Sequence, residues 1–227
     1  MNQDEPIRGL YPFLYGNKKD PVREREALLA SVSHKVEESI TIKQKFFDQY
    51  GSELVVMAEA LAGVFAQGGV LFTMGNGGSS CDADHLAVEF MHPITTGRPA
   101  LRAHSLTVDQ SMLTAVGNDI GFAHVFLRQL SALGQTKDAI FGFSTSGNSK
   151  NLIVAYQKAR DLGMRTFGLA GMEGGAMRES RLVDHLLVVP SDSVHRIQES
   201  HVTAYHILWD LVHTLLADHR GKLDKEI

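Results

Sequence analysis

The sequence predicts an α/β fold: three layers, with a doubly wound, flavodoxin-like sheet of five parallel strands and extra N-terminal helices. The first observation is that five short, almost continuously apolar runs recur along the chain, each bounded by glycine, proline or polar residues. Helical segments separate these runs, and buried strands alternating with helices are typical of a parallel sheet covered on both faces. The length of 227 residues also fits one large domain.

The N-terminal third predicts helices rather than strands. Residues 1–20 are mostly polar, contain Pro6 and Pro12, and are expected to form an irregular arm. From Pro21, a residue tolerated at a first helical position, apolar side chains recur every three or four residues: they are Leu28, Leu29, Val32, Val36 and Ile40. A second helix is expected over 52–67, ending at Gly68-Gly69. This surplus apolar surface indicates either additional core or a subunit interface.

The remaining elements follow from the spacing of apolar residues and glycines. We expect strands at residues 70–74, 101–106, 139–143, 165–169 and 186–189. We expect helices at residues 81–91, 110–116, 122–133, 151–162 and 196–217. Residues 21–219 should therefore form one domain, followed by a polar tail at 220–227.

Composition excludes several classes of protein. The net charge is −4, from 22 Lys and Arg against 26 Asp and Glu, so a general nucleic-acid binder is not expected, whereas a local anion site is permitted. One cysteine, Cys81, excludes an internal disulfide framework and fits a reducing, cytoplasmic location. The N-terminus lacks a signal-peptide pattern, and the longest apolar stretch, 54–66, is too short to span a bilayer, so no membrane association is expected.

Two strands are followed by polar loops at the edge where ligands bind in open α/β sheets. Residues 75–80 read Gly-Asn-Gly-Gly-Ser-Ser, which matches neither a dinucleotide fingerprint nor a P-loop. Residues 144–149 read Ser-Thr-Ser-Gly-Asn-Ser and come directly before a helix. Hydroxyls and free N–H groups at a helix N-terminus can hold a phosphate without a cation. The alternative, a helix-capping loop, explains one such residue better than four.

Two helices carry candidate metal ligands. His85 and Glu89 are four residues apart and share one helix face. Gln198 and His206 on the last helix lie about 80° and about 12 Å apart, so they reach one centre only by leaning together. The four side chains form a nitrogen and oxygen set suited to zinc or another divalent ion, and an exposed surface pair is the alternative. The other histidines of this helix, His201, His213 and His219, are mostly expected at the surface or an interface.

Four segments, in this order, resemble the sedoheptulose-7-phosphate isomerases, the bacterial phosphoheptose isomerase family of the sugar isomerase (SIS) superfamily. They are residues 74–85 with Glu89, residues 116–122, residues 144–149, and residues 196–199 with His206. The resemblance extends from about residue 25 to residue 217. Two positions depart from it: Pro93 stands where members often have arginine, and His195 where an acidic or small residue is commoner.

The resemblance implies a set of site residues. The phosphate would be held by Ser144, Thr145, Ser146 and Ser149. The sugar would be contacted by Asn76, Gly77, Gly78, Ser79, Glu89, Asn118, Asp119 and Gln198. Zinc would be bound by His85, Glu89, Gln198 and His206. The resemblance also implies a homotetramer whose active sites are shared between subunits, which favours the interface interpretation of the surplus helices and allows the zinc ligands to come from more than one chain.

The expected activity is a ketose–aldose isomerisation, converting sedoheptulose 7-phosphate to D-glycero-D-manno-heptose 7-phosphate for lipopolysaccharide heptose biosynthesis. Such a reaction moves a proton between C1 and C2 through an enediol, so it needs a base, an acid and a group that stabilises the enediolate. Glu89 is the candidate base and His206 the candidate acid, although the roles could be exchanged or either residue could serve mainly as a metal ligand.

Two other functions remain open at this point. One is a non-catalytic relative that binds a phosphosugar or the bacterial replication initiator. In that branch the counterparts of Glu89 and His206 are lost, whereas both are present here. The other is an isomerase for a different phosphorylated sugar, because the departures at Pro93 and His195 leave the exact substrate open.

Overall fold

The computed structural model describes residues 21–95 and 97–218, so the arm at 1–20 and the tail at 220–227 lie outside the described residues. The chain divides after Glu38 into two units, and each is described by itself. Helix α2 (Pro21–Ala66) runs from the first unit into the second.

The second unit contains the predicted sequence of alternating strands and helices. The strands are β1 (Leu71–Gly75), β2 (Ala103–Ser105), β3 (Ala139–Ser144), β4 (Arg165–Gly171) and β5 (His185–Val189). The helices are α3 (Gly78–Met91), α4 (Gln110–Asp119), η2 (Phe122–His124), α5 (Val125–Leu133), α6 (Lys150–Asp161), α7 (Gly175–Glu179) and α8 (Val194–Asp218).

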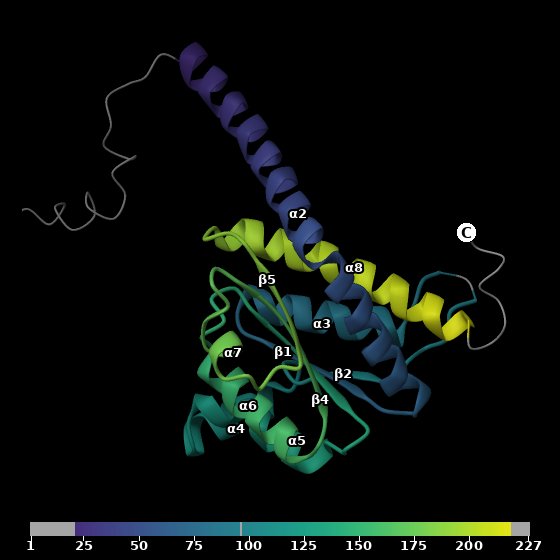
Figure 1. Ribbon diagram of the computed structural model, residues 1–227. Helices are drawn as coiled ribbons and strands as arrows, with labels where there is room; N and C mark the ends of the chain where they lie inside the picture. Colours follow the sequence, from purple (N-terminus) through teal and green to yellow (C-terminus); the bar gives the residue numbers. More distant parts are fainter. Residues whose placement is uncertain (1–20, 96, 219–227) are drawn as a thin grey trace, which may run out of the picture. The chain divides into compact units, whose positions relative to one another are not determined.

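All five strands are parallel, in the order β2-β1-β3-β4-β5, which is the order of flavodoxin-like sheets. The predicted fold class is therefore confirmed. The register pairs Leu71 with Ala139 and Gly75 with Phe143, so β1 and β3 end side by side. The helices that follow these two strands cover opposite faces of the sheet (Figure 1). Such a switch point opens a crevice at the carboxyl ends of the strands.

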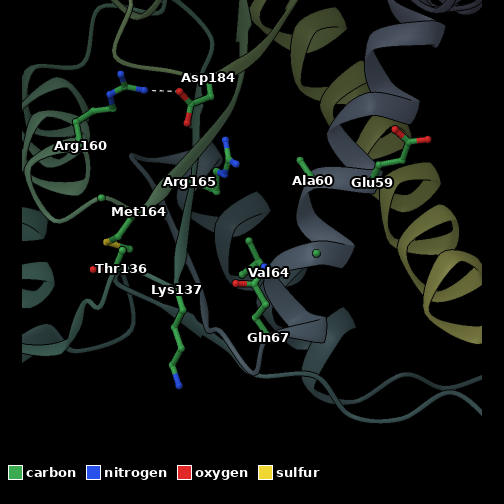
Figure 2. Close-up of a pocket in the computed structure, with 12 residues that line it drawn as sticks. Glu59, Ala60, Val64, Gln67, Thr136, Lys137, Arg160, Met164, Arg165 and Asp184 are labelled. Atoms are coloured by element: carbon green, nitrogen blue, oxygen red, sulfur yellow. Dashed lines mark hydrogen bonds and ion pairs between the residues drawn. The ribbon is translucent and has the colours of Figure 1, made fainter. Parts of the chain in front are cut away.

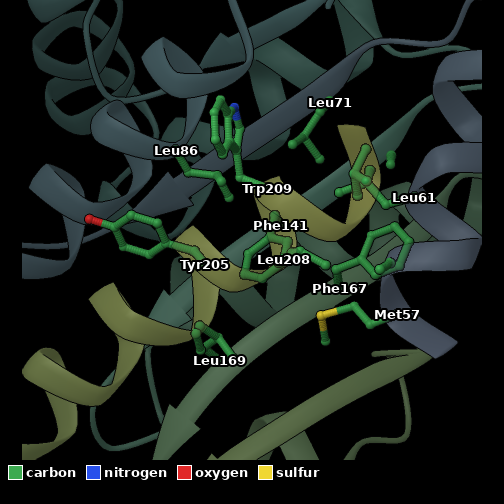
Figure 3. Packing of buried hydrophobic residues seen from close by; sticks show 14 of the residues in the cluster. Met57, Leu61, Leu71, Leu86, Phe141, Phe167, Leu169, Tyr205, Leu208 and Trp209 are labelled. Atoms are coloured by element: carbon green, nitrogen blue, oxygen red, sulfur yellow. The ribbon is translucent and has the colours of Figure 1, made fainter. Parts of the chain in front are cut away.

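Alternating strand residues supply two separate cores. On one face, Phe141 and Phe143 pack with α3, α8 and the part of α2 that belongs to the second unit. Figure 3 shows how Tyr205 and Trp209 of α8 lie in this cluster. On the other face, Ile140 packs with α4, α5 and α6. Because both faces are covered, the central strands β1, β3 and β4 are buried along nearly their whole length rather than on every second residue.

One element differs from the prediction: the N-terminal segment forms one helix instead of two. Gly51, beside the predicted start of the second helix, lies inside α2 with open space around its Cα, and no proline interrupts residues 22–66. Apolar residues also continue at helical spacing across the expected break, with Phe46 fully buried and Tyr50 partly buried against the core. A single glycine lowers helix propensity by about 1 kcal/mol, which this packing outweighs.

The apolar residues of the first unit do not add to the core. The side chains of Leu28, Leu29, Val32 and Val36 are all more than half exposed, as is that of Ile40 at the start of the second unit. These residues therefore do not form additional core, which was one of the two predicted explanations for the surplus apolar surface. A subunit interface remains a prediction.

No helix of the described residues is both long and apolar enough to cross a membrane.

Candidate phosphosugar and metal site

The first polar loop joins β1 to α3 through glycines that allow close packing. Gly77 has φ +56°, in the left-handed region that favours glycine. A Cβ atom at Gly75 would lie 2.1 Å from the carbonyl oxygen of Ser79, and one at Gly78 would lie 2.3 Å from Nε2 of Gln198. The loop thus folds tightly onto its own helix and meets the amide of Gln198, which comes from α8.

The second polar loop, between β3 and α6, does not serve as a side-chain cap. Ser149 is the N-cap residue of α6, yet its hydroxyl makes no capping hydrogen bond. Instead its Oγ lies 3.1 Å from Oγ of Ser144, whose Oγ also accepts a hydrogen bond from the N–H of Gly147 at 3.1 Å. The first N–H groups of an α-helix have no carbonyl partner within the helix. Hydroxyls and backbone donors therefore gather at one helix start, which is the geometry of a cation-free phosphate site.

The two loops are held together by a pair of amides. Nδ2 of Asn76 donates to Oδ1 of Asn151 at 2.9 Å, and Nδ2 of Asn151 donates to Oδ1 of Asn76 at 2.9 Å. Asn151 is buried and its Oδ1 also accepts from the N–H of Leu152 at 3.1 Å. This pair fixes the first polar loop to the first turn of α6, the helix that follows the second polar loop.

A cluster of nitrogen and oxygen donors lies between α3 and α8. One donor atom each from His85, Glu89 and His206 lies within 4.8 Å of the others. Nε2 of His85 is 3.1 Å from Oε1 of Glu89, and the rings of His85 and His206 have centroids 5.1 Å apart. All three groups belong to one chain, so these three need no second subunit to meet.

The donors around this cluster fit a divalent ion. Nδ1 of His85 is hydrogen-bonded to the hydroxyl of Tyr205 at 2.8 Å, which fixes the ring and directs Nε2 towards the cluster. Metal-binding histidines almost always have their second ring nitrogen held in this way. His85 and His206 are exposed on one side, so the cluster is open to a ligand. Two imidazoles and a carboxylate are the ligand types that zinc takes at open, three-residue catalytic sites.

Burial and neighbouring charges shift the pKa of several groups here. Burial and the nearby His85 lower the pKa of His206, although Glu89 opposes this, so the neutral imidazole is favoured. Burial raises the pKa of the Asp82 carboxyl to about 6, and His85 partly offsets it. Burial also raises the pKa of Tyr205, with Asp82 and Glu89 adding to the effect, so this hydroxyl keeps its proton.

The helix carrying Glu89 is held by residues that the sequence did not single out. Trp209 donates its indole N–H to the backbone carbonyl of Glu89 at 2.7 Å. The guanidinium of Arg98 lies 4.4 Å from the centre of the Trp209 ring and donates to Asp210 at 2.5 Å. The sequence places Tyr205 and Trp209, four residues apart, on one face of α8, but only the packing shows that this face lies against α3.

Some residues implied by the resemblance are not linked to the polar loops or to the cluster of His85, Glu89 and His206 by the contacts described above. Asn118 and Asp119 lie exposed at the end of α4, where Nδ2 of Asn118 donates to Oδ1 of Asp119 at 2.9 Å. Among the hydrogen bonds of the described residues, none joins either side chain to the two polar loops. The side-chain amide of Gln198 lies against Gly78.

The fold and the two polar loops define a class of protein. The profile of the SIS domain family matches residues 36–171, which is more than half of the chain and includes both loops, so this is an SIS-domain protein. Two solved structures share the architecture over nearly their whole length. One is a phosphoheptose isomerase from Francisella tularensis, with TM-score 0.78, 33% identity, and coverage of 82% of this chain and 97% of that one. The other is a phosphoheptose isomerase from Neisseria gonorrhoeae, with TM-score 0.74, 38% identity, and coverage of 82% and 98%.

Relatives with similar sequences identify the family of SIS-domain proteins to which the chain belongs. The phosphoheptose isomerase of Solidesulfovibrio magneticus is 43% identical over 82% of this chain and 90% of its own length. That of Pelobacter propionicus is 51% identical over 70% of this chain and 84% of its own. The chain belongs to the phosphoheptose isomerase family, and the resemblance found in the sequence is confirmed.

Proposed function

We propose that this protein isomerises sedoheptulose 7-phosphate to D-glycero-D-manno-heptose 7-phosphate. One observation carries the proposal: a carboxylate and an imidazole, Glu89 and His206, lie with His85 in one open cluster. The relatives at 43% and 51% identity are both named phosphoheptose isomerase, which is the same class of reaction. A substrate with a phosphate at one end and a carbonyl at the other suits a site with a hydroxyl-rich loop and an acid–base pair.

The proton transfer needs a base near C1 and C2 and a donor at the carbonyl oxygen. The carboxylate of Glu89 is suited to take the proton from the carbon next to the carbonyl. The neutral imidazole of His206, favoured by its lowered pKa, can donate its N–H hydrogen bond to the developing oxyanion or act as a metal ligand. Positioned acid–base groups of this kind typically contribute 10²–10⁴-fold to the rate.

The metal proposed here is zinc, held by His85, Glu89, Gln198 and His206. When bound, a divalent ion polarises the substrate carbonyl as a Lewis acid. The hydrogen bond between Nδ1 of His85 and the Tyr205 hydroxyl supports this ligand set, because the tautomer in which Nδ1–H donates to the hydroxyl oxygen leaves the lone pair of Nε2 free to face the cluster. The fourth proposed ligand is the side-chain amide of Gln198, which contacts Gly78. To bind the ion, this amide has to turn towards the cluster.

The phosphate is proposed to bind Ser144, Thr145, Ser146 and Ser149, and the sugar to contact Asn76, Gly77, Gly78, Ser79, Asn118, Asp119 and Gln198. The missing cap at Ser149 supports the first part, because a hydroxyl that leaves its own helix uncapped remains available to a ligand. Binding energy at the phosphate would position the reacting carbons near Glu89. The side chains of Asn118 and Asp119 are exposed, and Asn118 donates to Asp119.

The decisive experiment incubates the zinc-loaded protein with sedoheptulose 7-phosphate and separates the heptose 7-phosphate products. The variants Glu89→Gln and His206→Ala should abolish turnover, and a phosphosugar should still raise the melting temperature of each. A folded, metal-loaded and inactive wild type that binds phosphosugars would favour the non-catalytic alternative. Turnover of another phosphosugar instead would establish an isomerase with a different substrate, and near-normal turnover by both variants would refute the roles assigned to Glu89 and His206.

We further propose that the protein is a cytoplasmic homotetramer serving lipopolysaccharide heptose biosynthesis. The exposed apolar side chains at positions 28, 29, 32, 36 and 40 support self-association, because they recur at helical spacing on one α-helix. Light scattering coupled to size-exclusion chromatography tests the assembly: Val32→Glu combined with Val36→Glu should yield smaller species. A wild type that elutes as a monomer would exclude the tetramer.

A further inference from the structure

A cavity lies at the edge of the sheet opposite the two polar loops (Figure 2). It has a volume of about 640 Å³ and opens between the last turns of α2 and the starts of β3, β4 and β5. Small-molecule sites typically have volumes of about 300–1,000 Å³. The substrate phosphate proposed above would lie at the carboxyl ends of the strands, so this cavity belongs to a different place on the molecule.

Three cationic side chains from three separate segments line this cavity. Lys137 precedes β3, Arg160 lies in the last turn of α6, and Arg165 is the first residue of β4. Parallel strands begin at the same edge of the sheet, so residues that are distant in sequence are brought to one cavity. A local group of cations in a protein of net charge −4 is the feature expected of a site for an anion.

The acidic residues of the cavity leave this positive charge in excess. Asp184 forms an ion pair with Arg160, drawn as a dashed line in Figure 2, and its second oxygen accepts the N–H of Thr166 at 3.1 Å. Both oxygens of Asp184 are therefore engaged. Glu59 lies on α2, and in the view of Figure 2 its carboxylate points away from Arg165. Three cations against two carboxylates leave one positive charge.

Two of the three cations have no polar partner of their own. Within the described part of the chain, no hydrogen bond or ion pair engages the side chain of Lys137 or Arg165, and both are exposed to solvent. The guanidinium of Arg160 also retains N–H donors beyond the one given to Asp184. Guanidinium and ammonium groups with free donors are the usual partners of phosphate oxygens.

We propose that this cavity binds a small organic diphosphate of the nucleoside diphosphate class. Three cations lining one cavity exceed the need of a single phosphate, and the volume leaves room for an organic group beside two phosphates. The proposal does not depend on the isomerase activity, because none of its residues belongs to the polar loops or the metal cluster. Its ligand would bind at the amino ends of β3 and β4. The second polar loop, residues 144–149, follows the opposite end of β3.

Isothermal titration of the purified protein at low ionic strength tests the proposal with three probes: ADP, inorganic pyrophosphate and inorganic phosphate. ADP and pyrophosphate should bind saturably, and inorganic phosphate at least ten-fold more weakly. The double variant Lys137→Gln/Arg165→Gln should lose at least ten-fold in affinity for ADP. The control Arg128→Gln/Lys158→Gln removes the same charge from exposed or half-buried positions outside the cavity and should bind ADP like the wild type.

The second polar loop, residues 144–149, is the other place where ADP could bind through its phosphates. Ser149→Ala is therefore titrated in parallel and should keep its ADP affinity. Three results would overturn the proposal. They are the absence of saturable ADP binding by the wild type, an equal loss in the cavity and control variants, and a loss confined to Ser149→Ala. Inorganic phosphate binding as tightly as ADP would overturn the assignment to a diphosphate. Because the substituted side chains are exposed, a circular dichroism spectrum like that of the wild type is expected for each variant.

Discussion

The ring nitrogen Nδ1 of His85 lies 2.8 Å from the hydroxyl of Tyr205, although the two residues are 120 positions apart in the chain. The contact joins α3 to α8 and turns the other nitrogen of the imidazole towards Glu89. The phenol is almost fully buried and its pKa is raised, so it remains protonated over the physiological range. Tyr205 is thus a positioning residue for the cluster that we propose binds zinc.

Replacing Tyr205 by phenylalanine should weaken zinc binding by about 10–100-fold, the usual effect of removing a partner of a metal-binding histidine. Competition with a chelator of known affinity measures this. Tyr156→Phe is the matched control, because Tyr156 is also buried but lies in the core on the other face of the sheet and donates its hydroxyl to the backbone carbonyl of Phe167. That variant should lose stability and keep its zinc affinity. Equal zinc affinities for the wild type and Tyr205→Phe would refute the positioning role.

Ser149→Ala separates phosphate binding from helix capping. Because the hydroxyl makes no capping hydrogen bond, the free energy of unfolding should fall by less than the ~1 kcal/mol typical of a lost cap. The affinity for a phosphosugar should fall about ten-fold, since a hydrogen bond to a charged group contributes roughly 1.5–3 kcal/mol. In the control Asp109→Ala, a carboxylate that accepts the N–H of Met112 at 2.9 Å is removed from the start of α4.

The control should show the opposite pattern: stability about 1 kcal/mol lower and phosphosugar affinity unchanged. Urea unfolding and isothermal titration supply the two readouts. If Ser149→Ala destabilised the protein as much as Asp109→Ala and left phosphosugar affinity intact, the loop would be a capping loop after all.

Gly78→Ala should impair turnover without unfolding the protein. The added Cβ would lie 2.3 Å from Nε2 of Gln198 and 3.3 Å from its Cδ, so the end of a flexible side chain has to move. Displacing the amide of Gln198 should lower kcat/KM at least ten-fold, while the melting temperature changes little. Gly51→Ala adds the same methyl group inside α2, where nothing lies within 4 Å. It should gain up to ~1 kcal/mol in stability and keep full turnover; an equal kcat/KM for both variants would exclude a role for the contact at Gly78.

The fold was predictable because most strands lie in mainly apolar runs and most of these runs are bounded by glycine or proline. The hydroxyl loop and the pair of His85 and Glu89 were predictable for a similar reason, since neighbours in sequence remain neighbours in space. The contacts between α3 and α8 were not, because Tyr205 and Trp209 resemble ordinary core residues and only the packing of two distant helices brings them to His85 and Glu89. The prediction of two separate N-terminal helices was wrong because tertiary packing outweighs the low helix propensity of Gly51.

The histidines of α8 show the same limit. They were expected mostly at the surface or an interface, yet His201 and His213 are buried. Histidine is intermediate in its tendency to be buried, so its position depends on the partner that packing supplies. For His201 that partner is the carbonyl of Ala170 on β4, 3.1 Å from Nε2. Burial lowers its pKa to about 4, even though this hydrogen bond opposes the shift.

His201 should make the protein sensitive to acid. Its pKa is 6.5 when exposed and about 4 when folded, so between these pH values only the unfolded chain binds the proton. The stability contribution is therefore fully present above pH 6.5 and is lost as the pH falls towards 4, by roughly 3 kcal/mol in total.

Relative to His201→Gln, which keeps a donor for Ala170, the free energy of unfolding of the wild type should fall by this amount. Urea unfolding at a series of pH values measures the difference, in which other titrating groups such as Asp82 cancel. A flat difference for His201→Gln would mean that the folded and unfolded chains take up the proton of this imidazole at the same pH.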